Sequence, residues 1–317
     1  MDKIKQVLDK QFGIKANNVV EIISASWTMN YKITDGTKTY FFKMYDKSKT
    51  QTSLWTENID TYIPILFWLN ENTDLRGRIT SPYKTTSDEY LFEDDENIFL
   101  LFDYIEGETV GNSMMPSQLT EAAEILATLH NISHEIPFNM DKLKEDFSVP
   151  FCHSLEEFIT DELDKSPADI KSIMLPYLKQ LVEKNDEVKM LAEKFKAKTF
   201  EMALCHVDAH GNNLMQGERL VLVDWEMIKF APVELDLIMF TKKEYWDIFI
   251  KQYQKLRPSF ILDNDLLKFY VHRRNIEDTW AYIESITYDK QSVEQRRFDL
   301  NKLLSCLKVL DDDFFAI

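Results

Sequence analysis

Three oxygen-bearing side chains that could handle a metal ion or a proton lie close together in one stretch of the chain. Residues 204–240 read LCHVDAHGNNLMQGERLVLVDWEMIKFAPVELDLIMF, so polar residues interrupt an otherwise apolar strand pattern. Asp208 and Asn213 share one loop, and Asp224 ends the apolar run LVLV. Such hard oxygen ligands suit Mg²⁺. Phosphoryl transfer needs a set of this kind, because the protein must position an acceptor hydroxyl and hold Mg²⁺ against a triphosphate.

The order of these residues resembles that of the aminoglycoside phosphotransferases. HVDAHGNN is similar to the H-x-D-x-x-x-x-N catalytic loop, and VDWE is similar to the metal-binding segment of kinase-like phosphotransferases. The resemblance implies that Asp208 accepts the proton of the acceptor hydroxyl, and that Asn213 and Asp224 bind Mg²⁺ beside ATP. It also implies a structural role for His206 and a hydrogen-bonding role for Asp236, which would brace the loop.

Two other interpretations apply to the same stretch. An H-x-D sequence can be a buried, hydrogen-bonded pair, and an aspartate at a strand end can cap the helix that follows. The start DAHGNN also resembles the first ligand pair of dinuclear metallophosphoesterases. That class needs further Asp and Asn-His clusters downstream, and the sequence contains none.

The first half of the chain supplies candidates for holding the nucleotide. Lys43 closes the strand-like run TYFFKM, and Glu57 follows on a predicted helix. The two resemble the strand lysine and helix glutamate that orient the α- and β-phosphates in kinases. LLFDYIEGE resembles the segment between kinase lobes, which implies that the backbone of Asp103, Tyr104 and Ile105 binds adenine. The alternative for Lys43 is an ordinary solvent-exposed lysine at a strand end.

The region that covers the phosphates departs from the kinase pattern. Kinases usually place a glycine-rich loop there, whereas the first hairpin reads SASWTMNYK and has no glycine. Ser24, Ser26 and Asn30 could supply small or hydrogen-bonding groups, but Trp27 and Met29 are bulky. Because of this departure, a nucleotide-binding protein that catalyses no reaction is a further alternative for the function.

A late helix offers candidates for contacting the acceptor. FYVHRRNIEDTWAYIE, at 269–284, resembles a helix of the spectinomycin phosphotransferases, with H-x-R-x-x-E-D matched by His272, Arg274, Glu277 and Asp278. The resemblance implies that Glu277 and Asp278 help to bind substrate. The alternative is an ordinary charged helix with an apolar side.

The surrounding elements predict an α+β, bilobal, protein-kinase-like fold. Strand patterns run from Val19 to Met44, with Asp35-Gly36 as a hairpin signal, and recur near Ile79, 90–92 and 98–102. One helix, from about residue 51 to 71, is expected on this sheet, and the chain after residue 111 reads as mainly helical. We therefore predict a nucleotide-binding lobe at 1–102, a hinge at 103–111 and a catalytic lobe at 112–317 with a helical insertion at about 139–199.

Composition limits the partners. The net charge of −17 argues against a nucleic-acid partner and suits a cationic small-molecule acceptor, although acidity is also a common solubility feature. No apolar run approaches the length of a membrane span, and three scattered cysteines suit a reducing, cytoplasmic location. The favoured acceptor is an aminoglycoside or aminocyclitol such as spectinomycin; the alternative is a metabolic hydroxyl compound such as choline, homoserine or methylthioribose. The sequence leaves the oligomeric state open.

Overall fold

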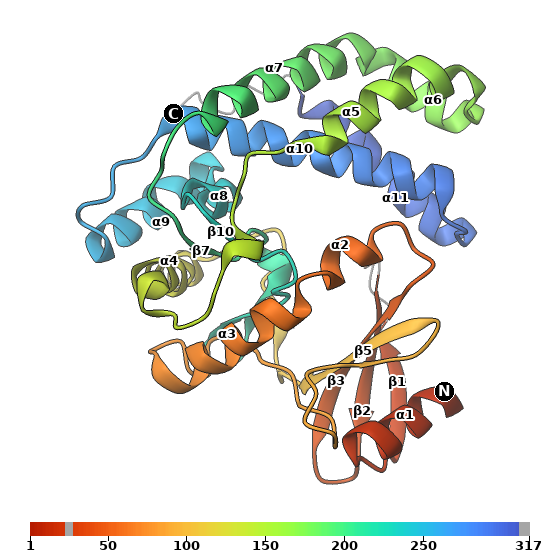
Figure 1. The fold of residues 1–317 in the computed structure, drawn as a ribbon, viewed down its shortest axis with the longest axis vertical. Coiled ribbons are helices and arrows are strands. Elements are labelled where there is room, and N and C mark those ends of the chain that lie inside the picture. Colours follow the sequence, from red (N-terminus) through yellow and green to blue (C-terminus); the bar gives the residue numbers. More distant parts are fainter. Residues whose placement is uncertain (23–27, 311–317) are drawn as a thin grey trace.

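The protein has a small sheet-containing lobe and a larger helical lobe (Figure 1). These two lobes confirm the predicted bilobal α+β fold. The computed structural model describes residues 1–22 and 28–310. Ser24, Ser26 and Trp27, considered above for covering the phosphates, lie outside the described residues.

The small lobe is built on an antiparallel sheet with strand order β1-β2-β3-β5-β4. Its strands are β1 (Asn18–Ile22), β2 (Met29–Thr34), β3 (Thr39–Asp46), β4 (Phe92–Glu93) and β5 (Asn97–Asp103). The Asp35-Gly36 turn joins β2 to β3 as predicted: the Asp35 carboxylate accepts hydrogen bonds from the Thr37 and Lys38 N–H groups, and Gly36 adopts φ 100°. The strand expected near Ile79 is a single bridge to Leu222.

Each face of this sheet is covered by a helix. Tyr40, Phe42 and Met44 of β3 pack with α1 (Asp2–Phe12), whereas Tyr45 packs with α3 (Ile59–Asn72) on the other face. The sequence-based expectation of one helix was therefore incomplete. Consecutive side chains of a strand point to opposite faces, so a β3 that is apolar at nearly every position needs cover on both sides.

The connection between the lobes leads into a second, three-stranded sheet. Its strands β6 (Glu108–Thr109), β8 (Leu214–Gln216) and β9 (Leu220–Leu222) pair in the order β6-β8-β9. Gly211 lies against this connection, and the Gly111 N–H donates to the Gly211 carbonyl at 3.0 Å. A Cβ added to Gly211 would stand 1.9 Å from the Gly111 carbonyl oxygen. The chain therefore passes so closely here that only glycine fits.

Helices form most of the large lobe. Outside the predicted insertion, the longer ones are α4 (Pro116–Ile132), α9 (Lys243–Leu256), α10 (Asn264–Tyr288) and α11 (Val293–Lys308), and α8 (Glu234–Leu237) is short. The short helix α2 (Thr52–Thr56) precedes α3 in the small lobe. A two-stranded sheet pairs β7 (Ala203–Cys205) with β10 (Lys229–Ala231). Single turns occur at Ser133–Glu135, Asp141–Leu143, Phe158–Glu162, Leu163–Lys165, Leu175–Tyr177, Gly211–Asn213 and Ile238–Phe240.

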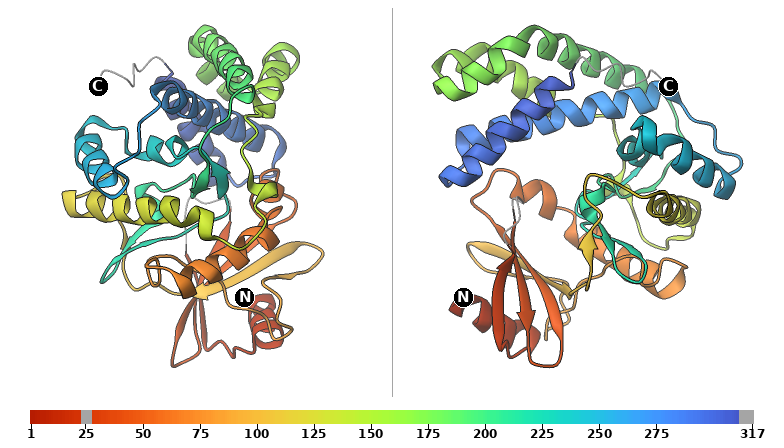
Figure 2. Two further views of the ribbon diagram at one scale, coloured as in Figure 1. Left: turned by 60° about the vertical axis from the view of Figure 1, so that its left-hand side comes forward. Right: turned by 180° about the vertical axis from the view of Figure 1, so that it is seen from behind.

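The segment predicted as a helical insertion forms α5 (Pro150–Glu157), α6 (Ala168–Met174) and α7 (Leu178–Lys196). These helices lie beyond α10 and α11, on the side away from the small lobe (Figure 2). Among the described residues, no helix combines the length and apolar character that a membrane span requires.

Candidate active site

The loop that carries Asp208 is held by one buried carboxylate. The chain leaves β7 and turns at Val207, whose φ of 74° is unfavourable for a β-branched residue. Asp236, on α8, accepts hydrogen bonds from the His206 N–H at 2.9 Å and from the Val207 N–H at 2.5 Å. Because Asp236 is fully buried, these bonds hold the strained turn in place.

The same carboxylate joins two further helices through His130 on α4. His130 Nε2 lies 2.9 Å from Asp236 Oδ2, and its Nδ1 lies 2.6 Å from the Tyr253 hydroxyl on α9. Burial lowers the pKa of His130 more than Asp236 raises it, so the ring is neutral. Nε2 therefore donates to Asp236, while Nδ1 accepts from Tyr253.

His206 ties the Asp208 loop to the segment that carries Asp224. Its Nε2 donates to the Val223 carbonyl at 2.9 Å, and its Nδ1 accepts from the Asp208 N–H at 3.2 Å. Burial lowers the pKa of His206, which suits this neutral tautomer. The ring also packs against Trp225, with 4.6 Å between ring centroids.

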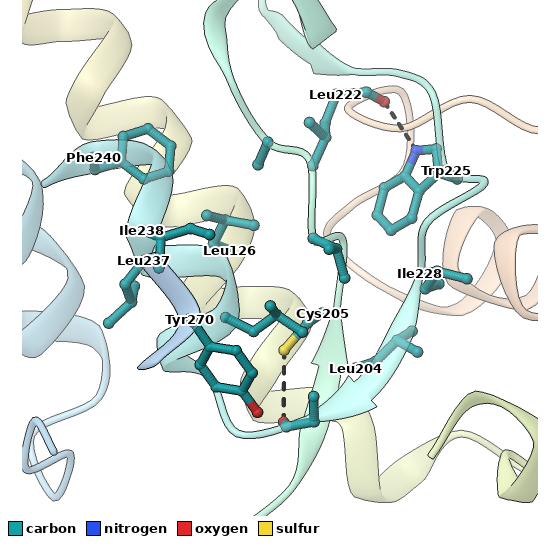
Figure 3. Close-up of a cluster of buried hydrophobic side chains, with 14 of the residues drawn as sticks. Leu126, Leu204, Cys205, Leu222, Trp225, Ile228, Leu237, Ile238, Phe240 and Tyr270 are labelled. Carbon is teal, nitrogen blue, oxygen red and sulfur yellow. Dashed lines mark hydrogen bonds between the residues drawn. The ribbon is translucent and has the colours of Figure 1, made fainter. Parts of the chain in front are cut away.

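Both segments lie on an apolar floor. Trp225 is buried and donates from Nε1 to the Leu222 carbonyl at 3.1 Å. The neighbouring side chains come from β7, β9, α4, α8, α10, the turn after α8 and the residue before β10, and Figure 3 labels Leu126, Leu204, Cys205, Ile228, Leu237, Ile238, Phe240 and Tyr270 among them. A close-packed floor of this kind resists movement of the polar groups above it.

Asp208 and Asn213 are in direct contact. The Asn213 amide donates from Nδ2 to the Asp208 carbonyl at 2.9 Å and to Asp208 Oδ2 at 2.7 Å. The Asn213 carbonyl accepts from the Val223 N–H at 3.0 Å, which adds a second link between the two segments. Burial raises the pKa of Asp208, but Arg274, His210 and His206 outweigh it, so the pKa is lowered and the carboxylate is ionised.

Lys43 and Asp224 meet across the space between the lobes. Lys43 Nζ lies 2.9 Å from Asp224 Oδ1 and 2.5 Å from Glu226 Oε1, and Tyr45 also donates to Glu226. Burial alone would lower the pKa of Lys43, but the Asp224 and Glu226 carboxylates raise it by more than burial lowers it, so the ammonium is charged. The Asp224 side chain is 45% exposed and its backbone has a positive φ of 64°, whereas Lys43 is 6% exposed.

The predicted ion pair between Lys43 and Glu57 is not formed. Glu57 lies at the end of α2, where the predicted helix breaks before α3, and its exposed carboxylate accepts from Asn58 at 3.2 Å. Within the described chain, the carboxylates that pair with Lys43 are Asp224 and Glu226. The reason is geometric: the lysine side chain leaves β3 toward the large lobe and reaches two acidic groups there.

The predicted hinge residues follow β5. The backbone of Asp103 continues the strand opposite β3, and its carboxylate pairs with Lys38 Nζ at 2.7 Å. The Tyr104 N–H donates to the Thr39 carbonyl at 3.3 Å. The backbone of Ile105 has no hydrogen-bond partner among residues 1–22 and 28–310, so its N–H and C=O are free for a ligand.

The two predicted acceptor-binding residues on α10 have different surroundings. Asp278 accepts from Arg274 Nε through both carboxylate oxygens, at 2.9 and 3.0 Å. Glu277 makes no hydrogen bond or ion pair with any residue that the structure describes. It lines a small cavity whose other charged residues are Glu145, Lys229, Arg273 and Arg274.

The sequence analysis did not propose roles for Arg274 and Glu226, which contact predicted site residues directly. Arg274 Nη2 donates to Asp208 Oδ1 at 2.9 Å, and Glu226 is an ion partner of Lys43. Both stand inside quoted motifs, Arg274 in H-x-R-x-x-E-D and Glu226 in VDWE. Polar residues inside a motif were therefore the available signal.

The oxygen atoms on Asn213 and Asp224 fit a Mg²⁺ ion. Asn213 uses its amide nitrogen toward Asp208, so its Oδ1 faces no hydrogen-bond donor in the described chain. Lys43 contacts Asp224 through Oδ1, which leaves Oδ2 as a second oxygen donor. An amide oxygen and a carboxylate oxygen from two linked segments are ligands of the type that Mg²⁺ takes beside a nucleotide phosphate.

Comparisons with solved structures agree with this fold. A spectinomycin phosphotransferase, APH(9)-Ia, bound to ADP and spectinomycin, has a TM-score of 0.76 and 17% identity over 98% of this chain and 97% of that chain. A microcompartment-associated aminopropanol kinase has a TM-score of 0.67 and 13% identity, with 98% and 96% covered. The choline kinase LicA of Streptococcus pneumoniae has a TM-score of 0.66 and 16% identity, with 97% and 98% covered.

A comparison with curated protein sequences gave no match. Residues 19–258 do match a family model, that of the phosphotransferase enzyme family. The match contains Lys43, the segment between the lobes and the whole stretch 204–240. It confirms the resemblance inferred from the sequence, and the chain belongs to the phosphotransferase enzyme family.

Proposed function

We propose that the protein transfers the γ-phosphoryl group of ATP to a hydroxyl of a cationic small molecule, with an aminoglycoside or aminocyclitol such as spectinomycin as the favoured acceptor. The observation that carries this proposal is the meeting of Asp208, Asn213, Asp224 and Lys43 on two hydrogen-bonded segments and the facing strand. Phosphoryl transfer needs mainly positioning and charge neutralisation, and these four side chains supply both.

On the nucleotide side, Lys43 would bind phosphate oxygens, because it is charged and already turned toward Asp224. Asn213 and Asp224 would hold Mg²⁺, which neutralises the phosphates when bound. The backbone between Asp103 and Ile105 would bind adenine, since the peptide groups of Ile105 are free. Glu226 would keep Lys43 oriented while Asp224 turns to the metal.

On the acceptor side, the Asp208 carboxylate would accept the hydroxyl proton. The acceptor oxygen forms a bond to the γ-phosphorus as the bond from that phosphorus to the β,γ-bridging oxygen breaks, and ADP leaves. His206 and Asp236 would act through the backbone of the loop. The proposed division of labour is then a nucleotide-binding lobe at 1–102, a hinge at 103–111 and a catalytic and acceptor-binding lobe at 112–317.

The class of acceptor is inferred from charge and from the structural neighbours. The chain has a net charge of −17, and the Glu277 carboxylate, which lines a cavity with Val207, makes no hydrogen bond within the described chain. The names of the similar structures include a spectinomycin phosphotransferase, an aminopropanol kinase and a choline kinase. Spectinomycin, aminopropanol and choline are all alcohols that carry a cationic nitrogen. A metabolic amino alcohol such as choline is therefore the second candidate.

An acceptor screen tests this proposal. The purified protein with Mg²⁺ and ATP should phosphorylate at least one member of a panel containing spectinomycin, other aminoglycosides, aminopropanol and choline. Release of ADP identifies hits, and mass spectrometry then shows whether the acceptor has gained one phosphoryl group. If spectinomycin is the best acceptor, expression of the protein should also protect sensitive bacteria from spectinomycin. We expect this protection to come from phosphorylation of the drug in the cytoplasm. ADP release that is independent of every acceptor would contradict the proposal.

A further inference from the structure

Arg274 connects helix α10 to the loop of Asp208. Its Nη2 donates to Asp208 Oδ1 at 2.9 Å, and its Nε donates to both oxygens of Asp278 at 2.9 and 3.0 Å. Asp278 lies four residues later on the helix, so the two side chains share one face. The guanidinium is therefore held between two carboxylates.

The Asp208 carboxylate is held from two sides. Asn213 donates to Oδ2 at 2.7 Å from within the loop, while Arg274 donates to Oδ1 from α10. The Asp208 side chain is 19% exposed, so part of it remains accessible to an acceptor. A planar guanidinium fixes the orientation of the groups it binds, because its N–H donors are rigidly arranged; a lysine ammonium is a point charge and does not.

Glu277 and Asp278 are neighbours in sequence but differ in availability. The charge of Asp278 is taken up by Arg274 through two hydrogen bonds. Glu277 makes no ion pair or hydrogen bond in the part of the chain that the structure describes, but it lines a cavity with Lys229, Arg273 and Arg274, and its charge raises the pKa of the Arg273 guanidinium against the effect of burial. Of the two carboxylates, that of Asp278 is held by direct hydrogen bonds to a cation, whereas that of Glu277 is not, so a cationic ligand would compete for Glu277 only with the longer-range attraction of Arg273 and Arg274.

We propose that Arg274, tethered by Asp278, is a positioning residue that orients the Asp208 carboxylate for the acceptor hydroxyl, and that Glu277 pairs with the cationic group of the acceptor. This inference rests on the proposed function and makes it more specific. It replaces the expectation that both acidic residues of α10 bind substrate. Asp278 acts on turnover through Arg274, whereas Glu277 acts on acceptor affinity.

Steady-state kinetics separate these roles. Arg274→Lys and Asp278→Asn should each lower kcat by about 10- to 100-fold, because a small misplacement of a reacting group has effects of this size, while the acceptor KM changes little. Glu277→Gln should raise the acceptor KM roughly two- to fivefold, the range of a partly exposed ion pair, and leave kcat nearly unchanged. An unchanged kcat in Arg274→Lys, or an effect of Asp278→Asn on KM alone, would overturn the assignment.

Matched substitutions elsewhere in the protein control for the loss of a carboxylate charge and for the loss of a planar guanidinium. Arg296 on α11 binds Asp169 through Nε and Nη2 at 3.0–3.2 Å, and Asp265 near the start of α10 pairs with Lys194. Arg296→Lys and Asp265→Asn should therefore leave both kinetic constants within twofold. Equal losses in these controls and in the Arg274 and Asp278 variants would mean that the effects are structural.

A stability measurement tests the contact without requiring turnover. Asp208→Asn, Arg274→Met and the double variant form a cycle in thermal unfolding. The decrease in Tm of the double variant should be smaller than the sum of the two single decreases, because one interaction is removed twice in that sum. Additive decreases would overturn the inference. If no acceptor is turned over, the proposed function fails, and this cycle still decides whether Arg274 holds Asp208.

Discussion

Replacing Asp236 by Asn keeps the size of the side chain but turns one of its acceptor oxygens into a hydrogen-bond donor. In the parent protein, Oδ1 accepts from the Val207 N–H, and Oδ2 accepts from the His206 N–H and from His130 Nε2. If the new NH2 group takes the place of Oδ1, it faces the Val207 N–H, and donor meets donor. The opposite orientation places the NH2 group against two donors, so the first is the less costly choice.

The size of the effect follows from these three bonds. A buried N–H that loses its acceptor costs about 1–3 kcal/mol, and bonds to a neutral oxygen are about 1 kcal/mol weaker than bonds to a charged one. Removal of a fully buried carboxylate that faces a neutral His130 offsets part of this loss. We expect a net decrease of about 2–4 kcal/mol in the free energy of unfolding.

Turnover should fall as well. The Val207 N–H bond holds the backbone at a φ of 74°, so its loss lets the turn relax and moves Asp208, the next residue. A shift of this kind costs about 10- to 100-fold in kcat. Urea unfolding measures the first effect, and acceptor-dependent ADP release measures the second.

Asp299 provides a matched control for this substitution. It is fully buried, but its hydrogen-bond donors are the side chains of Ser285, Gln291 and Gln295, which can rotate toward a new partner. Asp299→Asn should therefore destabilise the protein less and leave kcat unchanged. The reasoning would be refuted if Asp236→Asn changed the free energy of unfolding by less than about 1 kcal/mol and kept the parent kcat.

Two further predictions concern the metal ligands and the loop. Asp224→Ala should weaken ATP binding about 10- to 100-fold with Mg²⁺ present, the range seen when a metal site loses support, and much less without Mg²⁺; calorimetry with and without the metal measures this, and equal affinities in the parent and the variant would refute the ligand assignment. Gly211→Ala should lower the free energy of unfolding by about 1–3 kcal/mol through overpacking, because the new methyl group would stand 1.9 Å from the Gly111 oxygen. Gly217→Ala is the control in urea unfolding, because Gly217, like Gly211, lies outside the left-handed region and its added Cβ would stand 3.3 Å from the Glu106 oxygen. An equal loss there would contradict the overpacking explanation.

Local patterns were sufficient for much of the fold. Strand-like runs on either side of the Asp35-Gly36 pair predicted the β2–β3 hairpin, which the structure confirms. The polar residues inside the apolar stretch 204–240 identified two loops that are joined by the Val223 N–H and the His206 ring. Both signals lie within short segments, where the spacing of side chains is set by the strand itself.

Contacts between distant segments could not be predicted in this way. Lys43 pairs with Asp224 and Glu226, which are 181 and 183 residues away, rather than with the nearby Glu57. Arg274 reaches Asp208 over 66 residues because α10 passes the Asp208 loop. Which carboxylate meets a cation depends on how helices and sheets pack, and a single sequence does not state that packing. The break between α2 and α3, which leaves Glu57 exposed, has the same origin.

Transfer of phosphate to an acceptor hydroxyl by parent protein and by Asp208→Asn tests the central claim most directly. With the best acceptor from the screen, mass spectrometry should show the phosphorylated product for the parent. Asp208→Asn should lower the rate by about 10²- to 10⁴-fold, the contribution of a general base, while calorimetry shows Mg²⁺-dependent ATP affinity within a few-fold of the parent. A variant that forms product within tenfold of the parent rate would contradict the account, because the proton would then be accepted elsewhere.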